Sequence, residues 1–320
     1  MTSRSMQTIS RRRFLASAGL TLAALEFTPH SLLAAEQGLV IAARERGAKA
    51  EIKVQSLRGG VSALVGSGGN IAVLHGSDGK LIVDSGYAGS QEKIANALTG
   101  ISQDPMKQLI NTHWHFDHTD GNEWMHAAGA TITAHQNTRR HLSTKTRVDA
   151  WDFTFPPLPA GALPAEVFTT EKSVRLNGET VLLKYYGPSH TDGDISVYFT
   201  GADVLHTGDT WWNGRYPFID YSTGGHINGM IKAAEANLAL VTDKTIVIPG
   251  HGQIGGKTEL TEYRDLLKTI RDRVADLKEE GKSTDAIVTA KPTADYDAKW
   301  AGSFVNGDYF TRLVCRGLGL

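Results

Sequence analysis

Residues 111–118 read Asn-Thr-His-Trp-His-Phe-Asp-His and follow a short apolar run. This stretch places three histidines and an aspartate within six positions. Imidazole nitrogens and carboxylate oxygens are the ligands that Zn²⁺ and related divalent metals use in proteins. Side chains of an extended segment alternate between its two faces, so His113 and His115 are predicted to point the same way. Asp117 would continue this alternation and His118 would face elsewhere, which predicts two ligand subsets for two metals.

The alternative interpretation is a polar loop whose histidines cap a helix that begins near Thr119. A single His-x-His pattern would favour that alternative. The denser HxHxDH pattern favours a metal site, because so many buried ligand-type groups are costly to keep without a cation. The prediction therefore requires matching ligands elsewhere in the chain.

Composition places the chain among ordinary globular proteins and excludes several functions. It has 320 residues, of which 41% are hydrophobic and 21% charged. The formal net charge of −1 gives no basic field that would attract nucleic acid. The only cysteine, Cys315, excludes an internal disulfide and a thiolate-rich metal cage. Its apolar neighbours predict a buried structural thiol.

The first residues have the layout of an export signal. The segment Ser10–Leu15 reads SRRRFL and precedes a mildly apolar run that ends at Leu25. Twin arginines before such a run indicate the bacterial Tat route. The run of about 12 residues falls short of the roughly 20 that a membrane-spanning helix needs. We therefore interpret residues 1–35 as a Tat-type signal peptide, cleaved near Ala34 or Ala35.

This interpretation predicts a periplasmic or secreted protein that engages the Tat export machinery and has no stable membrane anchor. The absence of disulfides agrees with folding in a reducing compartment before export. Residues 36–320 are then the catalytic domain, with a C-terminal helical extension from about residue 257. The sequence does not predict the oligomeric state.

Alternating strands and helices are predicted along the rest of the chain. Apolar runs around turn residues predict hairpins at 71–83 and 195–205. Apolar spacing and capping residues predict helices at about 90–100, 119–128, 228–240 and 258–280. The proline- and aromatic-rich segment 151–164 is either an ordered loop over a site or a plain connector.

Four predicted strands share one property, which is that each leads into a metal-ligand type of residue. These residues are His113 with His115, His190, Asp209 and His251. Ends of neighbouring strands meet at one edge of a sheet, so residues far apart in sequence converge there. Rigid strands that carry ligands on the loops after them are a means of fixing metal geometry.

With these residues in place, the chain resembles the metallo-β-lactamase superfamily. The resemblance rests on HxHxDH at 113–118, His190 in GPSHTDGD, Asp209 in HTGDT and His251 in IPGHG, all in the family's order. It implies an α/β (α+β) fold, an αββα sandwich of two mixed β-sheets with outer helices and metals at one edge. It also implies two Zn²⁺ ions per chain, although this ligand set also accepts Mn²⁺ or Fe²⁺. The implied first-metal ligands are His113, His115 and His190, the second-metal ligands are Asp117, His118 and His251, and Asp209 bridges both metals.

Differences from the best-known members indicate which branch of the superfamily the chain resembles most. One lactamase subclass uses a cysteine on the second metal, and this chain has no cysteine before Cys315. Another subclass lacks the bridging aspartate, so Asp209 makes the chain more similar to the glyoxalase-II and lactonase branches. His115 stands where the flavodiiron oxidoreductases of the superfamily carry glutamate, which counts against that branch.

The resemblance predicts an exported, dinuclear zinc-dependent hydrolase. A metal-bridging hydroxide would attack the carbonyl carbon of an ester, thioester, lactone or lactam, and Asp117 would be catalytic by orienting or shuttling the proton. Two divalent metals carry a charge of +4, and Asp117, Asp209 and the hydroxide together carry −3. The net charge of the site is then about +1, which favours a small-molecule substrate with an anionic group. The alternative is a mononuclear-iron oxidoreductase like the persulfide dioxygenases, built on the site of His113, His190 and Asp209. A non-catalytic metal-binding protein is the third hypothesis.

Five further residues are candidates for support of the site or contact with substrate. Asp84 and Asp194 are predicted to fix histidine orientation. Arg215 and Trp211, which closely follow Asp209, are predicted to line the substrate mouth, although ordinary packing remains open for the tryptophan. His226 lies in a glycine-rich stretch and is predicted to reach the pocket.

Overall fold

The computed structural model describes residues 38–320. The predicted signal peptide at 1–35 lies outside the described residues. Within residues 38–320, no helix has the length and apolar character that a membrane crossing requires.

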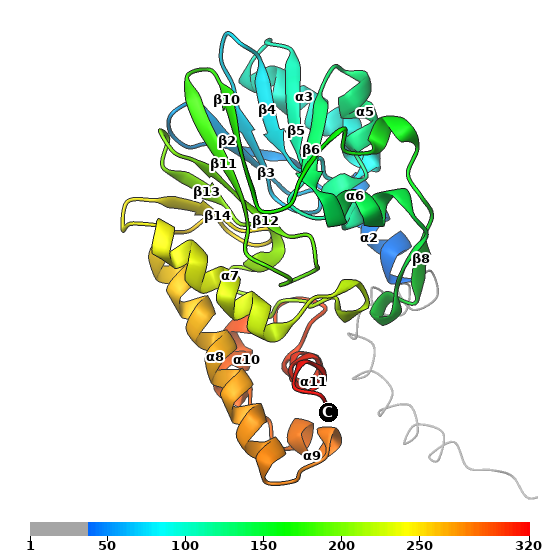
Figure 1. Cartoon of the computed structure of the whole chain (residues 1–320), viewed down its shortest axis with the longest axis vertical. Helices are drawn as coiled ribbons and strands as arrows, with labels where there is room; N and C mark the ends of the chain where they lie inside the picture. Colours follow the sequence, from blue (N-terminus) through cyan, green and yellow to red (C-terminus); the bar gives the residue numbers. More distant parts are fainter. Residues whose placement is uncertain (1–37) are drawn as a thin grey trace, which may run out of the picture.

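The larger of two main β-sheets is built from the first half of the chain (Figure 1). Its strands, in spatial order, are β1 (Lys53–Ser56), β2 (Val61–Val65), β3 (Ile71–Leu74), β4 (Lys80–Val83), β5 (Met106–Ile110), β6 (Thr131–His135) and β9 (Glu166–Phe168). The strands β1 to β4 pair antiparallel, whereas β4, β5, β6 and β9 pair parallel. The pair β3–β4 confirms the first predicted hairpin.

The second sheet follows the same plan in the second half of the chain. Its strands, in spatial order, are β10 (Glu171–Leu176), β11 (Glu179–Tyr185), β12 (Ile195–Phe199), β13 (Val204–His206) and β14 (Ile246–Ile248). The last pair, β13–β14, is parallel and the others are antiparallel. The pair β12–β13 confirms the second predicted hairpin, and both sheets are mixed, as predicted.

The two sheets pack face to face because strand side chains alternate between faces. Ala72 and Leu74 of β3 share one buried cluster with Val181 and Leu183 of β11. Each fully buried leucine or valine side chain stabilises the fold by about 1.5–3 kcal/mol relative to exposure. The alternate residues of the same strands face outward and require helices to cover them.

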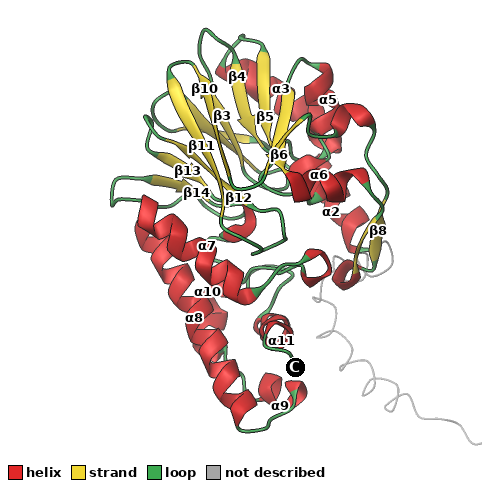
Figure 2. Cartoon of the chain, viewed as in Figure 1, coloured by secondary structure: helices red, strands yellow, loops and turns green. Residues whose placement is uncertain are grey.

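Helices cover the outer face of each sheet, which completes the predicted αββα sandwich (Figure 2). On the first sheet, Ile71 and Val73 pack with Ile94 and Leu98 of α3 (Gln91–Ile101). On the second, Leu205 belongs to the cluster formed with α7 (Ile227–Leu240) and α8 (Lys257–Glu279). The remaining helices are α2 (Leu39–Lys49), α4 (Phe116–Thr119), α5 (Asn122–Ala127), α6 (Gln136–Ser143), α9 (Thr284–Thr289), α10 (Ala294–Trp300) and α11 (Gly307–Gly317).

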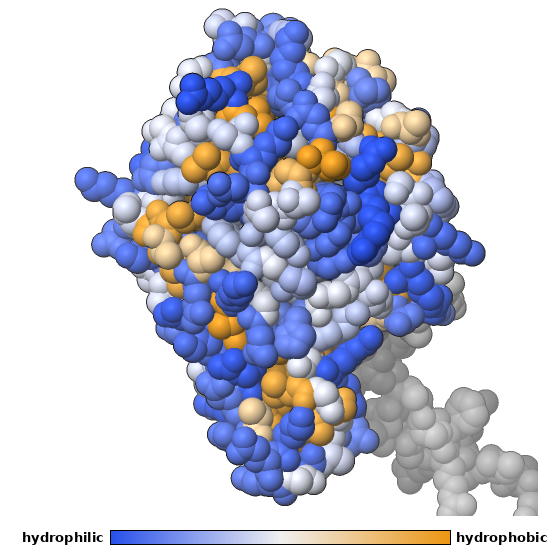
Figure 3. All heavy atoms as spheres, in the orientation of Figure 1, coloured by the Kyte–Doolittle hydropathy of each residue, from blue (hydrophilic) through white to orange (hydrophobic). Residues whose placement is uncertain are grey.

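The C-terminal residues form a helical layer outside the second sheet. In Figure 1, α8 runs alongside α7, and α9 to α11 continue the chain at the lower end of the molecule. Most of the apolar positions predicted for the helix at 258–280 are buried, among them Leu260, Leu267 and Ile270, whereas Leu277 is half-buried. Cys315 is buried in α11, as predicted. Figure 3 shows a mainly hydrophilic surface on this face of the molecule, with apolar residues in small separate patches.

The helix predicted at 119–128 is wrong in its boundaries. The chain instead forms α4 and α5, which are separated at Gly121. A Cβ atom at Gly121 would lie 2.4 Å from the carbonyl oxygen of Ser85, so the backbone approaches a neighbouring loop closely here. This contact depends on the tertiary arrangement and overrides the local helical pattern.

The proline- and aromatic-rich segment is ordered and reaches the site. A 3₁₀ turn at Asp149–Trp151 leads into it. It contains β8 (Phe153–Phe155), which pairs with the preceding β7 (Thr146–Val148), and a 3₁₀ turn at Ala160–Ala162. The ring of Trp151 stacks on that of Phe218 with centroids 5.1 Å apart. Of the two interpretations left open, the segment is therefore the ordered loop.

Candidate metal centre

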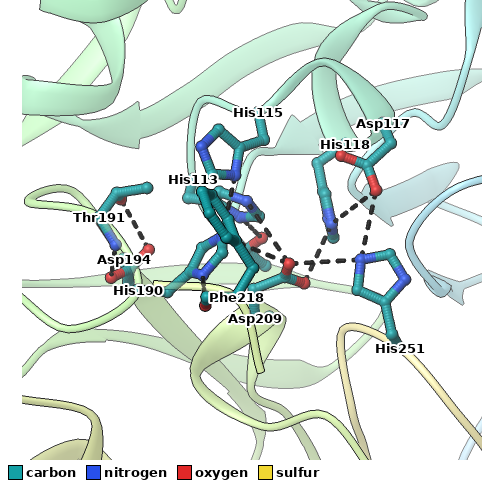
Figure 4. Close-up of polar contacts among 12 residues, drawn as sticks. His113, His115, Asp117, His118, His190, Thr191, Asp194, Asp209, Phe218 and His251 are labelled. Carbon is teal, nitrogen blue, oxygen red and sulfur yellow. Dashed lines mark hydrogen bonds and ion pairs between the residues drawn. The ribbon is translucent and has the colours of Figure 1, made fainter. Parts of the chain in front are cut away.

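Four loops bring seven candidate ligands together at one edge of the sandwich (Figure 4). The loops follow β5, β11, β13 and β14, which are the four strands predicted to deliver ligands. The seven residues fall into two groups of side chains whose ligand atoms lie within 4.8 Å of one another. The first group is His113, His115, His190 and Asp209, and the second is Asp117, His118 and His251.

Asp117 joins the second group because the chain turns before it. The predicted alternation places Asp117 on the face of His113 and His115, and this is wrong. The helix α4 begins at Phe116, so Asp117 and His118 project from a helical turn while the two earlier histidines lie on extended backbone. The result is the division of ligands that the family resemblance implies.

In the first group, three imidazoles and a carboxylate converge. The distance from His190 Nε2 to His115 Nδ1 is 2.8 Å, and that from His190 Nε2 to Asp209 Oδ2 is 3.4 Å. His113 Nε2 lies 4.0 Å from the same carboxylate oxygen. All four side chains are almost completely buried.

The second group lies on the other side of Asp209. His118 Nε2 is 3.1 Å from Asp209 Oδ1, and His251 Nε2 is 3.3 Å from Asp209 Oδ2. Asp117 Oδ2 is 3.2 Å from His251 Nε2 and 3.7 Å from His118 Nε2. Asp209 therefore stands between the two groups and contacts members of both.

The hydrogen bonds behind the histidines direct their lone pairs toward the centre. His190 Nδ1 lies 2.8 Å from the carbonyl oxygen of Phe218 and must donate to it, which leaves Nε2 as the acceptor. His118 Nδ1 lies 2.7 Å from Asp84 Oδ2 and likewise donates outward. A ligating imidazole in proteins is held in this way by a carboxylate or carbonyl on its other nitrogen.

His113 is oriented through a relay that ends on Asp84. The Thr112 hydroxyl donates its hydrogen to Asp84 Oδ2 at 2.7 Å, so it can only accept from His113 Nδ1, 3.1 Å away. Asp84 also accepts from the backbone nitrogen of Thr112 at 2.7 Å. Its backbone has φ of 65°, a left-handed conformation that places the carboxylate under both ligand groups. Asp84 therefore has the contact with a ligand histidine that was predicted for it.

The predicted contribution of Asp194 is less direct. Its carboxylate accepts from the hydroxyl groups of Ser189 and Thr191 and from the backbone nitrogen of Thr191, each at 2.7 Å. It thus holds the loop that carries His190 and does not contact the imidazole through a hydrogen bond.

Sequence reasoning missed Asp220, the carboxylate that orients His115. His115 Nε2 lies 3.1 Å from Asp220 Oδ2, which leaves Nδ1 facing the centre. Asp220 is held in turn by the Thr223 hydroxyl at 2.6 Å and the backbone nitrogen of Ser222 at 2.9 Å. The only sequence signal is an acidic residue at the end of an apolar run, Phe218-Ile219-Asp220, and no ligand motif includes it.

Two glycines allow backbone to approach the ligands. A Cβ atom at Gly69, in the loop between β2 and β3, would lie 2.0 Å from the ring of His118. A Cβ atom at Gly250 would lie 2.0 Å from Asp209 Oδ1. Both distances are far below van der Waals contact, so any side chain there would displace a candidate ligand.

The donor set fits divalent metal ions. Three buried ligand atoms, His113 Nε2, His118 Nε2 and Asp209 Oδ1, make no hydrogen bond to any described residue. Buried polar atoms are rarely left without partners, because each costs free energy. All three point into the space between the two groups in Figure 4. Nitrogen and oxygen ligands in this arrangement suit Zn²⁺, Mn²⁺ or Fe²⁺.

A cavity of about 390 Å³ opens over the centre. It is lined by Asp117, Asp209 and three of the histidines, and its other walls are largely aromatic. Arg215, which is exposed, lines it as predicted. Trp151 and Phe218, whose rings stack on each other, also line it.

Two of the predicted substrate residues lie elsewhere. Trp211 is fully buried in the helical core, whereas its neighbour Trp212 pairs in backbone register with His251 and lines the cavity. Consecutive residues on extended backbone face opposite sides, so only one of the two can face the substrate. His226 is the N-terminal capping residue of α7, where its Nδ1 accepts from the backbone nitrogen of Asn228 at 3.0 Å, and it does not line the cavity.

The two ligand groups differ in protonation. For His251, desolvation by burial lowers the pKa, but the charges of Asp209 and Asp117 outweigh it and raise the pKa to about 9. His118 is likewise desolvated, and Asp209, Asp117 and Asp84 together raise its pKa well above the usual value. For His113, desolvation and the neighbouring His118 lower the pKa well below the usual value.

We expect zinc binding to metal-free protein to release protons at pH 7. Because the pKa of His251 is about 9, that imidazole is protonated at pH 7 and must lose its proton to bind a cation. The apparent affinity of the second group should therefore rise as the pH increases toward 9. Calorimetric titration in two buffers of different ionisation enthalpy measures the number of protons released, and a heat independent of the buffer would contradict this prediction.

Comparison with known proteins agrees with the fold. A sequence profile of the Metallo-beta-lactamase superfamily matches residues 64–266, which is more than half of the chain. The chain is 29% identical over 160 residues to a hydroxyacylglutathione hydrolase of Polaromonas sp. (strain JS666 / ATCC BAA-500), a match that covers 49% of this chain and 53% of that protein. It is 27% identical over 185 residues to a probable metallo-hydrolase of Bacillus subtilis (strain 168), covering 57% of this chain and 84% of the relative.

Solved structures show the same fold. The DIM-1 metallo-beta-lactamase superposes with a TM-score of 0.55 at 19% identity, covering 68% of this chain and 98% of that chain. The sec-alkylsulfatase Pisa1 from Pseudomonas sp. superposes with a TM-score of 0.63 at 15% identity, covering 87% of this chain and 52% of that chain. At such identities the likeness concerns the fold alone. The chain spans only about half the length of the hydroxyacylglutathione hydrolase that it matches.

Proposed function

Because this chain belongs to the metallo-beta-lactamase superfamily and is a metal-dependent hydrolase, we propose that it works with two zinc ions on a carbonyl substrate. The substrate bond would be an ester, thioester, lactone or lactam. The observation that carries the proposal is the complete pair of ligand groups with Asp209 between them. His113, His115 and His190 would hold one ion, Asp117, His118 and His251 the other, and Asp209 would contact both.

Two bound divalent ions would supply Lewis acidity and would lower the pKa of water toward about 7, which provides a nucleophile at neutral pH. The protein's own residues then determine the orientation of the reaction. Asp84 and Asp220 fix the rings of His118 and His115, so the ligand atoms are in place before substrate arrives. Asp117 is the more exposed of the two ligand carboxylates, at 14% of its side chain against 2% for Asp209. We propose that Asp117 receives and passes on the proton at its cavity-facing carboxylate.

Two features support hydrolysis over iron-dependent oxidation. The alternative, a persulfide dioxygenase-like oxidoreductase, would need the first group alone. Here the second group is also complete, with His118 buried and Asp117 and His251 half-buried, and His118 is oriented by Asp84 at 2.7 Å. Metal-binding histidines usually donate their other ring nitrogen to such a carboxylate, so this hydrogen bond supports a metal ion on the second group.

The relatives and Asp209 indicate which type of bond the enzyme cleaves. The relatives named above include a hydroxyacylglutathione hydrolase, and a further relative, 25% identical over 201 residues (62% of this chain and 72% of that protein), is a type 2 metallo-beta-lactamase of Bacillus sp. (strain 170). Asp209 between the two groups favours the glyoxalase-II and lactonase branches that the sequence indicates. We therefore propose thioesters and lactones ahead of β-lactams.

We also propose that the enzyme is exported by the Tat route and is periplasmic or secreted. The SRRRFL segment supports this proposal.

Metal content of the purified mature protein tests the proposal. We expect two zinc ions per chain in the wild type and about one in His118→Ala, because that change removes one buried ligand of the second group. His75→Ala, which changes a histidine outside the centre, is the matched control and should keep two. One iron per chain that is unaffected by His118→Ala would overturn the hydrolase proposal in favour of oxidation.

A further inference from the structure

Walls of the cavity over the metal centre come from both ends of the described chain. On one side, α2 contributes Leu39, Ala43 and Arg46, and on another, the link between α10 and α11 contributes Ser303 and Phe304. All of these residues lie outside the part of the chain that matches the family, residues 64–266. The part of the chain that matches the family thus supplies the ligands, whereas segments outside that part help to enclose the space where a substrate would lie.

The wall from the C-terminal link is apolar and open. Phe304 is 47% exposed, which makes it one of the few large apolar side chains among the described residues that remain so accessible. Its ring centroid lies 6.1 Å from that of Trp212 and 6.0 Å from that of Phe218, and both of these rings line the same cavity. Trp151 extends this aromatic wall by stacking on Phe218. Aromatic pairs at these distances favour a further ring packed against them.

The rim of the cavity carries unpaired positive charge. Arg46 and Arg215 both line the cavity and are exposed. Neither forms an ion pair with a carboxylate in residues 38–320, although most other arginines there do. The carboxylates within the cavity, Asp117 and Asp209, already belong to the ligand groups. Two free guanidinium groups over an aromatic wall form a site for an anion attached to an apolar ring.

Arg215 lines both the cavity over the metal centre and a second cavity beside it. A second cavity of about 620 Å³ shares Arg215 and His251 with the first and is bordered by Lys53 and Gln55 of the exposed strand β1. A substrate held in the aromatic cavity can therefore extend past the second ligand group into a more polar space.

We propose that the substrates are amphipathic anions with an apolar, ring-sized group, and that α2 and the segment 301–306 select them. The ring packs against Phe304 and its aromatic neighbours, and the anionic group pairs with Arg46 and Arg215 at the rim. This proposal rests on the proposed function in placing the scissile bond over the metal centre, but the binding of ring and anion is independent of hydrolysis.

Binding of 2-naphthoate to the metal-loaded protein, measured by quenching of tryptophan fluorescence, tests the proposal without turnover. Trp151 and Trp212 lie in the cavity and report on occupation. We expect Phe304→Ala to weaken binding about tenfold, because it removes the apolar contact of one ring. We expect Arg46→Gln to weaken binding of 2-naphthoate about fivefold and to leave binding of neutral 2-naphthalenemethanol unchanged. Arg46→Lys, which keeps the charge, should restore most of the affinity.

Matched variants exclude general effects on the fold. Phe153→Ala removes a ring from the β7–β8 hairpin outside the cavity, and Arg175→Gln removes an exposed arginine of β10. Both should bind 2-naphthoate like the wild type. Unchanged affinity in Phe304→Ala and Arg46→Gln, with naphthoate bound through the metals alone, would overturn the proposal. The protein could also bind naphthoate through Phe304 and Arg46 but hydrolyse no carbonyl substrate. That result would support the proposed binding of ring and anion and would reject the proposed function.

Discussion

Replacement of Asp209 by alanine should remove both metal ions and lower kcat/KM on the order of a thousandfold or more. The carboxylate lies between the two ligand groups, with Oδ1 3.1 Å from His118 Nε2 and Oδ2 3.4 Å from His190 Nε2. Its loss would leave Asp117 as the only carboxylate among the seven candidate ligands, so less of the positive charge of a bound cation would be compensated. Desolvation raises the pKa of Asp209, but the neighbouring His251 and His118 outweigh it and keep the pKa well below the usual value, so the carboxylate is charged at every working pH.

Metal content and kcat/KM measured on the same preparation test this prediction. Asp209→Asn, which keeps the shape but not the charge, separates electrostatic from steric loss. Asp243→Ala is the matched control, since Asp243 is 93% exposed and pairs only with Lys257 at 3.5 Å. Circular dichroism would show whether the fold persists. A folded Asp209→Ala protein with two zinc ions and near wild-type turnover would contradict the placement of this residue between the metals.

The ligands could be predicted from the sequence because they depend on local order along the chain. Each lies in the loop or helical turn that comes after a strand, and strand ends meet at one sheet edge in any sandwich of this kind. Spacing within HxHxDH was enough to indicate two subsets, but it assigned Asp117 to the wrong one on geometric grounds. The turn into α4 at Phe116 begins inside the motif, and no residue there marks a helix start. The family resemblance implied the correct ligand group for Asp117, whereas the alternation of side chains did not.

The residues that support and enclose the centre could not be predicted in the same way. Asp220 reaches His115 across 105 positions, and its neighbours carry no ligand pattern. Gly69 matters only because its loop lies against His118 after folding. Phe304 and Arg46 line the cavity because two terminal segments dock beside the sheet edge, which is a tertiary property without a local signal. Trp211 was predicted to line the cavity because it is close to Asp209 in sequence, but its side chain is buried in the core. Closeness in sequence does not determine on which face of the chain a side chain lies.

Asp117→Asn should reduce kcat by about a hundredfold to ten-thousandfold, the range that positioned acid–base groups contribute. The carboxylate lines the cavity, and its Oδ2 lies 3.2 Å from His251 Nε2. Desolvation raises its pKa, but the adjacent His118 and His251 outweigh this effect and lower the pKa below the usual value, so the group accepts hydrogen bonds as a carboxylate at neutral pH. An asparagine keeps the volume and one acceptor oxygen, but it carries no charge and cannot take a proton.

The pH profile distinguishes a proton-transfer function from simple loss of a ligand. If Asp117 only binds metal, added zinc should restore kcat in Asp117→Asn and the profile should keep its wild-type shape. If Asp117 also moves the proton, kcat should stay low at saturating zinc and its acidic limb should disappear, because the group that titrates there has been removed. Asp243→Asn, the same chemical change at an exposed position, should leave both kcat and the profile unaltered. Wild-type kcat in Asp117→Asn would rule out a catalytic function for this residue, although the metal site could still stand on its other ligands.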